Sequence, residues 1–102
     1  MSKIEWSQTA LLDLTNIHSY ISADSKFYAD HFLARLVRAA ERAGQHPQSG
    51  RRVPEADDEA IRELIFQNYR IVYQYRENRI RIVTVLHGAR DLSHKDPKPW
   101  DI

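Results

Sequence analysis

The 102 residues of this chain, 42% hydrophobic and 28% charged, have the size and composition of one globular domain. The absence of cysteine excludes disulfides and thiol chemistry and argues against a structural zinc site. No apolar run approaches the roughly 20 residues of a membrane span, and the first residues do not read as a signal peptide. We therefore expect one cytoplasmic domain over residues 1–102, with no membrane association, no metal and no other cofactor.

The net charge of +1 conceals an uneven distribution of arginine. Eleven arginines stand against four lysines, and the segment 35–52 holds five arginines and one acid, whereas the segment 55–59 holds four acids. Arginine forms bidentate contacts with carboxylates and phosphates that lysine cannot copy. Two interpretations are open: solvated faces of helices and strands, or a surface for an acidic protein or a nucleic acid.

The chain begins with alternating polar and apolar residues at 3–6, which predicts a short strand. Ser7 follows as a candidate N-cap, because its hydroxyl can accept a hydrogen bond from a backbone N–H of the first helical turn. Beyond it, apolar residues recur at steps of three and four, which predicts a helix over residues 7–21. The apolar face predicted for this helix contains Leu11, Leu14, Ile17 and Ile21.

A second helix is predicted after a short break at residues 22–25, which is rich in capping side chains. So short a connection makes the two helices antiparallel neighbours in a helical hairpin. Gly44 and Pro47 are expected to end the second helix, and the charged segment 47–59 reads as a surface loop. The apolar stripe of this helix contains Ala29, Leu33, Leu36, Val37, Ala40 and Ala43, and its opposite side carries Arg35, Arg38 and Arg42.

After residue 61 the periodicity changes to that of strands. Residues 62–66, 69–76 and 79–87 include many β-branched and aromatic side chains, and turns at 67–68 and 77–78 join them into an antiparallel meander. The predicted fold class is therefore α+β: an N-terminal strand, an antiparallel helical hairpin and a three-stranded antiparallel meander. Both helices are expected to pack on one face of the sheet.

Alternation along the strands predicts which side chains share a face. One face is apolar enough to receive the helices, and the other is mixed and basic, suited to solvent or a partner. Residues 93–102 contain two prolines and are expected to form an irregular C-terminal arm. On the last strand Ile80, Ile82 and Leu86 are predicted to share one face, and Arg81, Val83, Val85 and His87 the opposite one.

A cluster of basic side chains near the end of the sheet is the candidate for chemistry. Arg70 on the middle strand and Arg90 just after the last strand could hold a phosphodiester and stabilise its developing charge. His87 could act there as general acid or base. A structural alternative is that Arg90 and Asp91 form an ion pair that closes the turn. The acids of the segment 55–59 are expected to be solvated.

Four motifs in one order and spacing resemble the RelE/ParE superfamily of toxins from bacterial type II toxin–antitoxin modules. They are P-x-S-G-R-x-V-P-E at 47–55, R-E-L at 62–64, Y-R-I-V-Y at 69–73 and V-L-H-G-A-R-D-L at 85–92. Each motif alone is weak, but four in register cover nearly the whole chain. The H-G-A-R-D ending is more similar to the ParE branch, often called plasmid stabilisation proteins, than to the RelE branch.

The resemblance implies the fold predicted above and a cognate antitoxin whose acidic, amphipathic C-terminal segment wraps the toxin. Such a segment would pair its carboxylates with arginines.

Gly88 is expected to permit a backbone conformation that a Cβ would strain, and Asp91 to anchor the C-terminal arm with Arg90. The residues expected to bind a partner are Arg35, Arg38, Arg42, Arg70, Arg81 and Arg90.

The two branches differ in target. The resemblance to ParE implies inhibition of DNA gyrase without catalytic residues, whereas RelE-like members are ribosome-dependent mRNA endoribonucleases. The basic residues of the RelE branch fall near Ile61 and Glu63 here, and its C-terminal tyrosine falls near Asp96. These departures favour gyrase inhibition. The alternative is a ribonuclease whose site consists of Arg70, His87 and Arg90.

Overall fold

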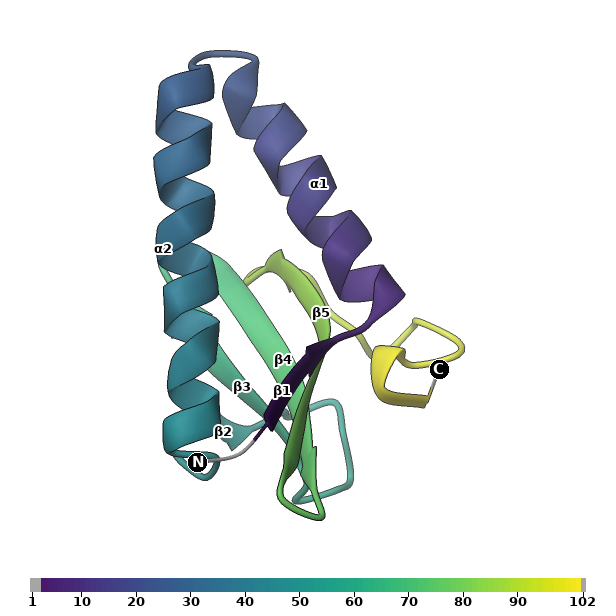
Figure 1. The fold of residues 1–102 in the computed structure, drawn as a ribbon. Coiled ribbons are helices and arrows are strands. Elements are labelled where there is room, and N and C mark those ends of the chain that lie inside the picture. The colour runs from purple at the N-terminus through teal and green to yellow at the C-terminus, as the bar shows by residue number, and fades with distance from the viewer. Residues whose placement is uncertain (1–2, 102) are drawn as a thin grey trace.

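The computed structural model describes residues 3–101, which form two layers (Figure 1). A hairpin of two helices, diverging like the arms of a V, lies across one face of a five-stranded sheet. The predicted α+β architecture is confirmed. In chain order the elements are β1 (Lys3–Trp6), α1 (Gln8–Ser22), α2 (Lys26–Gln45), β2 (Arg51–Arg52), β3 (Ile61–Phe66), β4 (Tyr69–Arg76), β5 (Arg79–His87) and the 3-10 helix η1 (Pro99–Asp101).

Helix α1 begins where the sequence predicts, because the hydroxyl of Ser7 accepts a hydrogen bond from the backbone N of Ala10 at 3.0 Å. Its buried face differs by one residue from the predicted one. Leu11 is half-exposed, and Ala10 takes its place against the core beside Leu14 and Ile17. A small alanine at this position lets the first turn of α1 lie close to the sheet.

Helix α2 is capped by the hydroxyl of Ser25 and extends to Gln45. The stripe predicted for it is mostly correct, but Phe32 and Ala39 are buried as well. Gly44 lies inside the helix and does not terminate it, and the backbone N of His46 makes the capping hydrogen bond to the carbonyl of Arg42.

The sheet has the strand order β1-β5-β4-β3-β2. The predicted meander of β3, β4 and β5 is antiparallel, and β1 adds to it by pairing in parallel with β5, Ile4 opposite Ile80. The segment 47–59 was predicted as a loop, but it contains the two-residue strand β2. Arg51 lies opposite Glu63 in this pairing, which brings the segment against the edge of the sheet.

Both hairpin turns have residues in the left-handed region. Glu77 and Asn78 have φ angles of 53° and 61°, as the two central residues of a type I′ turn require. Gln67, in the β3–β4 turn, has a φ of 56°. The twist of a type I′ turn matches the twist of the strands that it joins, so Glu77 and Asn78 close the β4–β5 hairpin with only two residues.

A β-bulge in β5 changes which side chains share a face. Val72 lies opposite Thr84 and Tyr73 lies opposite Ile82, so Val83 is an extra residue in β5. Alternation therefore reverses at this point. Leu86 lies on the face away from the helices, and its predicted grouping with Ile80 and Ile82 is wrong.

Residues of α1 and of the segment before it hold this bulge in place. The hydroxyl of Ser7 donates to the carbonyl of Val83 at 3.1 Å. A carboxylate oxygen of Asp13 accepts hydrogen bonds from the hydroxyl of Thr84 at 2.5 Å and from the backbone N of Val85 at 2.9 Å. Backbone groups of β5 beside the bulge thus find partners in α1 and in its N-cap.

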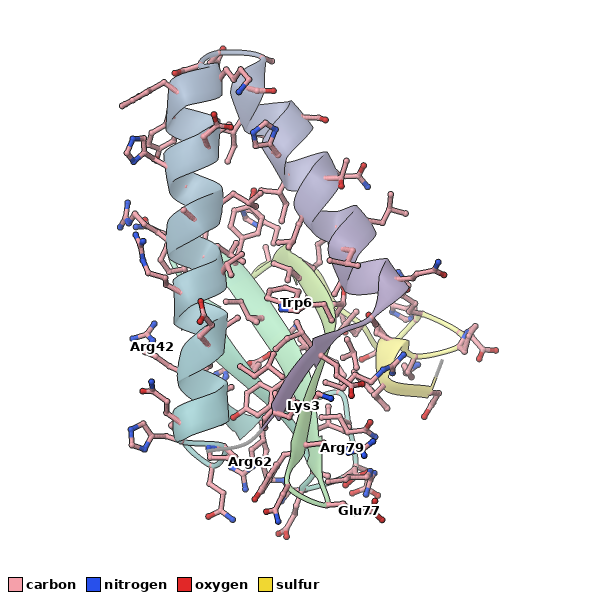
Figure 2. All side chains as sticks on the ribbon, viewed as in Figure 1. Lys3, Trp6, Arg42, Arg62, Glu77 and Arg79 are labelled. Carbon is pink, nitrogen blue, oxygen red and sulfur yellow. The ribbon has the colours of Figure 1, made fainter. Side chains whose placement is uncertain are left out.

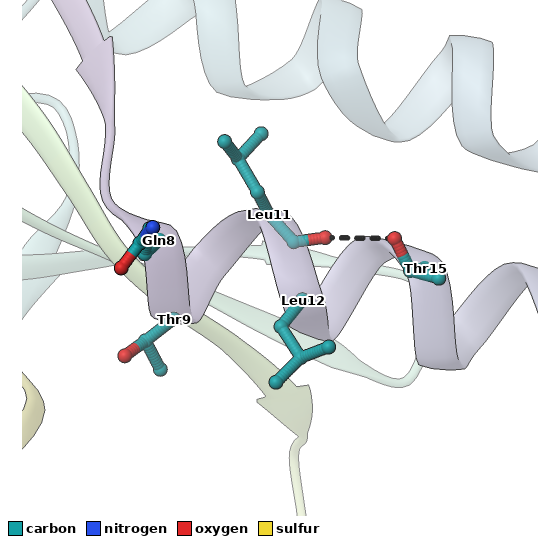
Figure 3. A pocket seen from close by; sticks show the side chains of 5 residues that line it. All are labelled: Gln8, Thr9, Leu11, Leu12 and Thr15. Atoms are coloured by element: carbon teal, nitrogen blue, oxygen red, sulfur yellow. Dashed lines mark hydrogen bonds between the residues drawn. The ribbon is translucent and has the colours of Figure 1, made fainter.

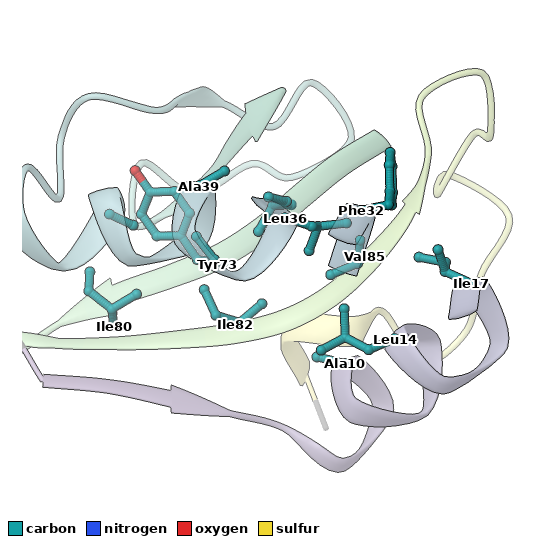
Figure 4. Packing of buried hydrophobic residues seen from close by; sticks show 13 residues of the cluster. Ala10, Leu14, Ile17, Phe32, Leu36, Ala39, Tyr73, Ile80, Ile82 and Val85 are labelled. Carbon is teal, nitrogen blue, oxygen red and sulfur yellow. The ribbon is translucent and has the colours of Figure 1, made fainter. Parts of the chain in front are cut away.

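The main core lies between the hairpin and the sheet (Figure 4). Leu36 is its central helical side chain and is completely buried, as are Tyr73, Ile80 and Ile82 on the strands below it. Burial of one such aliphatic side chain stabilises the fold by roughly 1.5–3 kcal/mol. This core fixes the hairpin on the sheet.

A second core covers part of the opposite face, which was predicted to be open and basic. Val72, Val83 and Leu86 are buried there beneath residues from two chain segments. Val53 comes from the loop after β2, and Leu92 comes from the segment after β5. That prediction is wrong because the loop and the C-terminal arm fold back over the sheet.

The C-terminal arm is irregular up to η1, where Pro99 is buried and Trp100 packs against the second core. Residue 102, the last of the predicted arm, lies outside the described residues. Trp100 holds the end of the arm against the second core, and the arm, yellow in Figure 1, lies beside β5.

Candidate functional site

A cluster of four charged side chains, three of them largely buried, lies on the face of the sheet away from the helices. Nη1 and Nη2 of Arg70 each donate to one carboxylate oxygen of Glu55 at 2.8 Å. Nε of Arg70 donates to Glu63 at 2.6 Å, and Nε of Arg51 donates to the other oxygen of Glu63 at 2.5 Å. Arg70 and the two glutamates are thus largely removed from water, whereas Arg51 balances the second negative charge from the exposed edge of the sheet.

The cluster also connects three distant segments of the chain. Arg70 stands on β4 and Glu63 on β3, whereas Glu55 belongs to the loop between β2 and β3. Nη1 of Arg70 donates further to the carbonyl of Arg90 at 3.0 Å, and Glu55 accepts a hydrogen bond from the backbone N of Leu92 at 3.0 Å. The loop and the start of the C-terminal arm are thus tied to the middle of the sheet.

The pKa values of the paired groups reflect this geometry. The hydrogen bonds from the Arg70 guanidinium lower the pKa of Glu55 to about 2. The same contact raises the pKa of Arg70 above its ordinary value. Both side chains therefore keep their charges at every pH at which the protein would normally function.

The prediction that Arg70 presents its charge on an open basic face is wrong. Only 4% of the residue is exposed, and Glu55, Glu63 and a backbone carbonyl engage its guanidinium. A partner cannot contact Arg70 without displacing these groups. Of the six arginines predicted to bind a partner, Arg70 is therefore buried and bonded to groups of its own chain.

His87 does not share a site with Arg70. Register places His87 opposite Tyr69 and Arg70 opposite Leu86. The ring of Tyr69 contacts both His87 and Phe32 of α2, with centroids 5.7 Å apart in each pair, so His87 lies on the helix side of the sheet. The bulge separates the two predicted catalytic side chains by placing them on opposite faces.

Arg90 and Asp91 do not form the predicted ion pair. Asp91 instead accepts a hydrogen bond from the backbone N of Ser93 at 2.8 Å, which lowers its pKa. Arg90 contributes its main-chain carbonyl to Arg70, while its side chain is exposed. The start of the arm is anchored by Glu55 and Leu92 rather than by the predicted pair.

Gly88 is needed for close approach and not for a special backbone conformation. No described glycine has a positive φ. A side chain at Gly88 would therefore be strained by its neighbours and not by the backbone conformation. Its backbone N donates to the carbonyl of Asn68 at 2.6 Å, and a Cβ on Gly88 would lie 3.2 Å from the same oxygen. A side chain here would press on the β3–β4 turn.

The remaining predicted partner arginines fall into separate regions. Arg35, Arg38 and Arg42 lie along one flank of α2, next to Phe66 at the end of β3. Arg81 lies on β5 next to β1, opposite Glu5. The structure therefore brings three of the six together along α2, while Arg70 meets Arg90 only at the main chain of Arg90, and Arg81 lies apart from both.

Sequence reasoning missed the two glutamates of the buried cluster. Glu55 was assigned to a solvated acidic loop, and Glu63 was noted only as a departure from a family pattern. The available signal was the pattern of the strand that contains Glu63, because an acid at an alternating position between Ile61 and Ile65 must face the same side as they do. The partners themselves lie too far apart in sequence to be inferred.

The outer face of α1 is uncharged and partly apolar. Leu11 and Leu12 project from it in Figure 3, and the shallow depression between them is also lined by Gln8, Thr9 and Thr15. The hydroxyl of Thr15 bonds back to the carbonyl of Leu11 at 3.2 Å. This face has no polar group aimed at a ligand and resembles a protein-contact surface more than a catalytic pocket.

Comparison with known proteins identifies the family. Residues 4–92 match the ParE toxin of type II toxin-antitoxin systems, parDE. This chain belongs to the ParE toxin family. Toxin RelE2 of Caulobacter vibrioides is 33% identical to it over 91 residues, which are 88% of this chain and 99% of that toxin. The resemblance inferred from the four motifs is confirmed.

The fold agrees with the same relationship. A structure of a chromosomal ParDE toxin–antitoxin system from P. aeruginosa superposes with a TM-score of 0.72 at 18% identity. The match covers 85% of this chain and 96% of that chain. The family match makes the protein the toxin of a type II toxin–antitoxin system, and such a system implies a cognate antitoxin as its partner. Within residues 3–101, neither helix combines the length and hydrophobicity needed to cross a bilayer.

Proposed function

We propose that this ParE-family toxin binds and inhibits DNA gyrase and does not cleave mRNA on the ribosome. The observation that carries the proposal is the position of Arg70 and His87 on opposite faces of the sheet. A ribonuclease of this type must activate a 2′-hydroxyl, stabilise the charge on phosphorus and protonate the leaving oxygen. Those groups have to converge on one phosphate.

The bonding of Arg70 supports the same proposal. To bind a phosphate it would have to release two carboxylates, Glu55 and Glu63, to which it is already hydrogen-bonded. Glu63 also stands where ribonuclease relatives are expected to carry a basic residue. A buried carboxylate at this position repels a phosphate and neutralises the arginine that would otherwise attract it.

A gyrase inhibitor of the binding type needs a recognition surface and no catalytic constellation. The helical hairpin offers exposed apolar side chains that the core does not use, and such patches mark protein contacts. At least half of the surface of each of these residues is accessible to water: Leu11, Leu12, Tyr20, Phe27 and Tyr28.

The alternative function is a ribosome-dependent mRNA endoribonuclease, which the similarity to a toxin named RelE2 keeps open. Its site would have to be assembled from Arg90 and His87, because Arg70 is engaged. The two functions differ in their products: relaxed or cleaved DNA in one case, and truncated mRNA in the other.

Two assays on one preparation distinguish them. The purified toxin is added to a gyrase supercoiling reaction and, separately, to ribosomes translating a defined mRNA, and His87→Ala is tested beside it. We expect both proteins to inhibit supercoiling and neither to cleave mRNA. Cleavage of mRNA that the substitution abolishes, with supercoiling unaffected, would establish the ribonuclease instead.

A growth assay shows whether the toxin is active at all. Expressed without its antitoxin in a bacterium, the chain should reduce colony counts, and co-expression of the antitoxin should restore them. Unimpaired growth with folded toxin in the cells would contradict an active toxin of either kind.

A further inference from the structure

The outer face of α1 carries no charge. Every exposed side chain of this helix is uncharged, although 28% of the residues in the chain are charged. The exposed side of α2 carries both acids and bases, and its Arg42 extends outward in Figure 2. Depletion of charged residues is typical of the core of a protein interface. The exposed residues of α1 are Gln8, Leu11, Leu12, Thr15, Asn16, Ser19 and Tyr20.

The groups of α1 that can carry charge near neutral pH have partners away from this face. Asp13 accepts hydrogen bonds from the side chain and backbone of β5, and His18 contacts Asp30 of α2. The core is equally separate, because Leu14 and Ile17 point into it from the opposite side of the helix. The outer face is therefore left over after the fold has used the other three sides of α1.

This face has a hollow near one end and a projection near the other. Leu11 and Leu12 flank a shallow depression of about 470 Å³ close to the start of the helix (Figure 3). Tyr20, with 78% of its surface exposed, projects from the helix about two turns further along. A hollow and a projection on one helix can each receive the other when two such helices meet.

The positions of these residues make the face complementary to itself. Leu12 and Ser19 lie equally far from the midpoint between Thr15 and Asn16. An antiparallel helix pair with its two-fold axis at that midpoint therefore sets each Leu12 over the small Ser19 of the other copy. The same axis brings each Tyr20 to the level of the other copy's depression, beside Leu12. Reciprocal pairs of this kind are what an isologous interface requires.

We propose that the outer face of α1 is the contact between two copies of this toxin, packed as an antiparallel helix pair. A residue beside a two-fold axis meets its own copy, so a charged side chain there would be repelled. Thr15 and Asn16 stand at the axis and carry no charge, whereas the exposed flank of α2 would bring arginines such as Arg38 and Arg42 against their copies. Charge thus favours self-association through α1 over self-association through α2.

The arrangement of the elements favours the antiparallel direction. The hairpin connection extends beyond the sheet in Figure 1, so an antiparallel pair places the two sheets at opposite ends. The dipoles of the two helices then oppose each other, which is the favourable orientation. The inference concerns the toxin alone and depends on neither gyrase nor mRNA as its target.

The size of the contact sets the expected strength. The 15 residues of α1 span about 22 Å, and a helix is about 10 Å wide. Such a footprint is small beside the roughly 800 Å² per partner of a standard interface. We therefore expect a dimer that forms at micromolar concentrations and dissociates on dilution. A partner that contacts Tyr20 meets only separated copies, so dimerisation lowers the concentration of toxin available to it.

Sedimentation of the purified toxin over a range of concentrations tests the proposal. The apparent mass should rise from that of one chain, 12.0 kDa, towards twice that value. Leu12→Lys should raise the dissociation constant of the dimer tenfold or more, because it places a charge in the contact from both sides (about tenfold for each 1.4 kcal/mol). The matched control is Ile65→Lys, since Ile65 is a similarly exposed aliphatic residue, 53% against 60%, but lies on β3.

Single cysteines test the geometry, because the chain has none of its own. Asn16→Cys places a thiol where each copy meets itself, and mild oxidation should link two chains. Gly and charged positions are avoided by choosing Gln8→Cys as the control, which the antiparallel pairing sets near Ala23 of the other copy and far from its own. A disulfide requires Cα atoms within about 7 Å of each other, so the control should stay unlinked.

Each result supports or overturns the proposal. The mass of a single chain at every concentration overturns it, as does a dimer that Leu12→Lys leaves intact or that both lysine variants weaken equally. Equal linkage of Asn16→Cys and Gln8→Cys overturns the antiparallel pair. A monomeric toxin whose Leu12→Lys variant binds its antitoxin more weakly assigns the face to the antitoxin instead. Thermal unfolding shows that each variant is folded, and Ser19→Lys replaces Leu12→Lys if the latter is not.

Discussion

The guanidinium of Arg70 and the carboxylate of Glu55 face each other in a bidentate contact, with both nitrogen–oxygen distances at 2.8 Å. This pair joins the central strand β4 to the loop between β2 and β3, whose Val53 also packs in the second core. Burial makes the contact strong only as long as both partners are present. It therefore predicts how the protein responds to loss of one charge.

Replacement of Glu55 by Gln should destabilise the fold by about 2–4 kcal/mol, because a buried arginine then lacks one of its two balancing carboxylates. Urea unfolding of the purified toxin measures the change. The matched control is Glu59→Gln, since Glu59 is exposed and lies 4.0 Å from Arg52. We expect the control to change stability by less than about 0.5 kcal/mol. Equal stabilities of the two variants would show that the buried pair contributes nothing net.

The same pair predicts the response to acid. The folded-state pKa of Glu55, about 2, lies below its ordinary value of 4.5. A depressed pKa contributes stability above pH 4.5 that is lost as the pH falls from 4.5 towards 2. The loss from this one group is on the order of 3 kcal/mol. Unfolding midpoints over this range should fall less steeply in Glu55→Gln, and parallel curves for the two proteins would contradict the assignment.

Much of the fold could be predicted because local sequence patterns determine most of its helices and strands. β1, β4 and β5 have the predicted bounds, since alternation and β-branched side chains mark strands directly. Ser7 and Ser25 mark the helix starts for an equally local reason. What local patterns could not supply was pairing: neither the parallel contact of β1 with β5 nor the short strand β2 has a signal of its own.

The candidate site was harder to predict because it depends on the bulge at Val83. One additional residue in a strand changes no residue type, yet it moves His87 to the face opposite Arg70. The burial of Glu55 is equally invisible, because its partners Arg70 and Leu92 lie 15 and 37 residues away. Alternation predicts faces only as long as the register is unbroken.

Gly50 should tolerate substitution less well than Gly88. A Cβ on Gly50 would lie 2.5 Å from the hydroxyl of Tyr73 and 2.7 Å from the carbonyl of Glu63, whereas one on Gly88 would meet its nearest atom at 3.2 Å. Gly50→Ala also threatens the hydrogen bond from its backbone N to Tyr73. We expect losses of about 2–3 kcal/mol for Gly50→Ala and about 1 kcal/mol for Gly88→Ala. Thermal unfolding of both variants decides whether the order is right.

The β4–β5 turn should respond to substitution in the opposite direction. Glu77 and Asn78 both have a positive φ, which Asn and Gly adopt more readily than Glu. The double substitution Glu77→Asn, Asn78→Gly should therefore stabilise the toxin by roughly 1 kcal/mol. Both this double variant and Asn78→Gly alone give up an exposed hydrogen bond from Tyr75, so most of the gain should come from Glu77→Asn. Urea unfolding measures the effect, and a destabilised double variant would count against a type I′ turn.

The proposal of gyrase binding predicts that exposed aromatic side chains matter for toxicity more than for stability. Tyr20 and Phe27 stand near the connection of the helical hairpin with 78% and 74% of their surfaces exposed. Replacing either by Ser should shift the free energy of unfolding by no more than about 0.5 kcal/mol. If the hairpin contacts gyrase, the same variants should inhibit supercoiling about tenfold less well, because aromatic side chains dominate protein interfaces.

Stability and inhibition must be measured on the same preparations, so that a partly unfolded variant is not mistaken for an inactive one. Lys26→Ser is a suitable control, because it lies beside Phe27 on the same exposed turn and its ion pair with Asp30 is solvent-exposed. We expect it to retain full inhibition. Unchanged inhibition by Tyr20→Ser and Phe27→Ser would show that the end of the hairpin does not contact gyrase. Leu11 and Leu12 on α1 would then be the next residues to substitute.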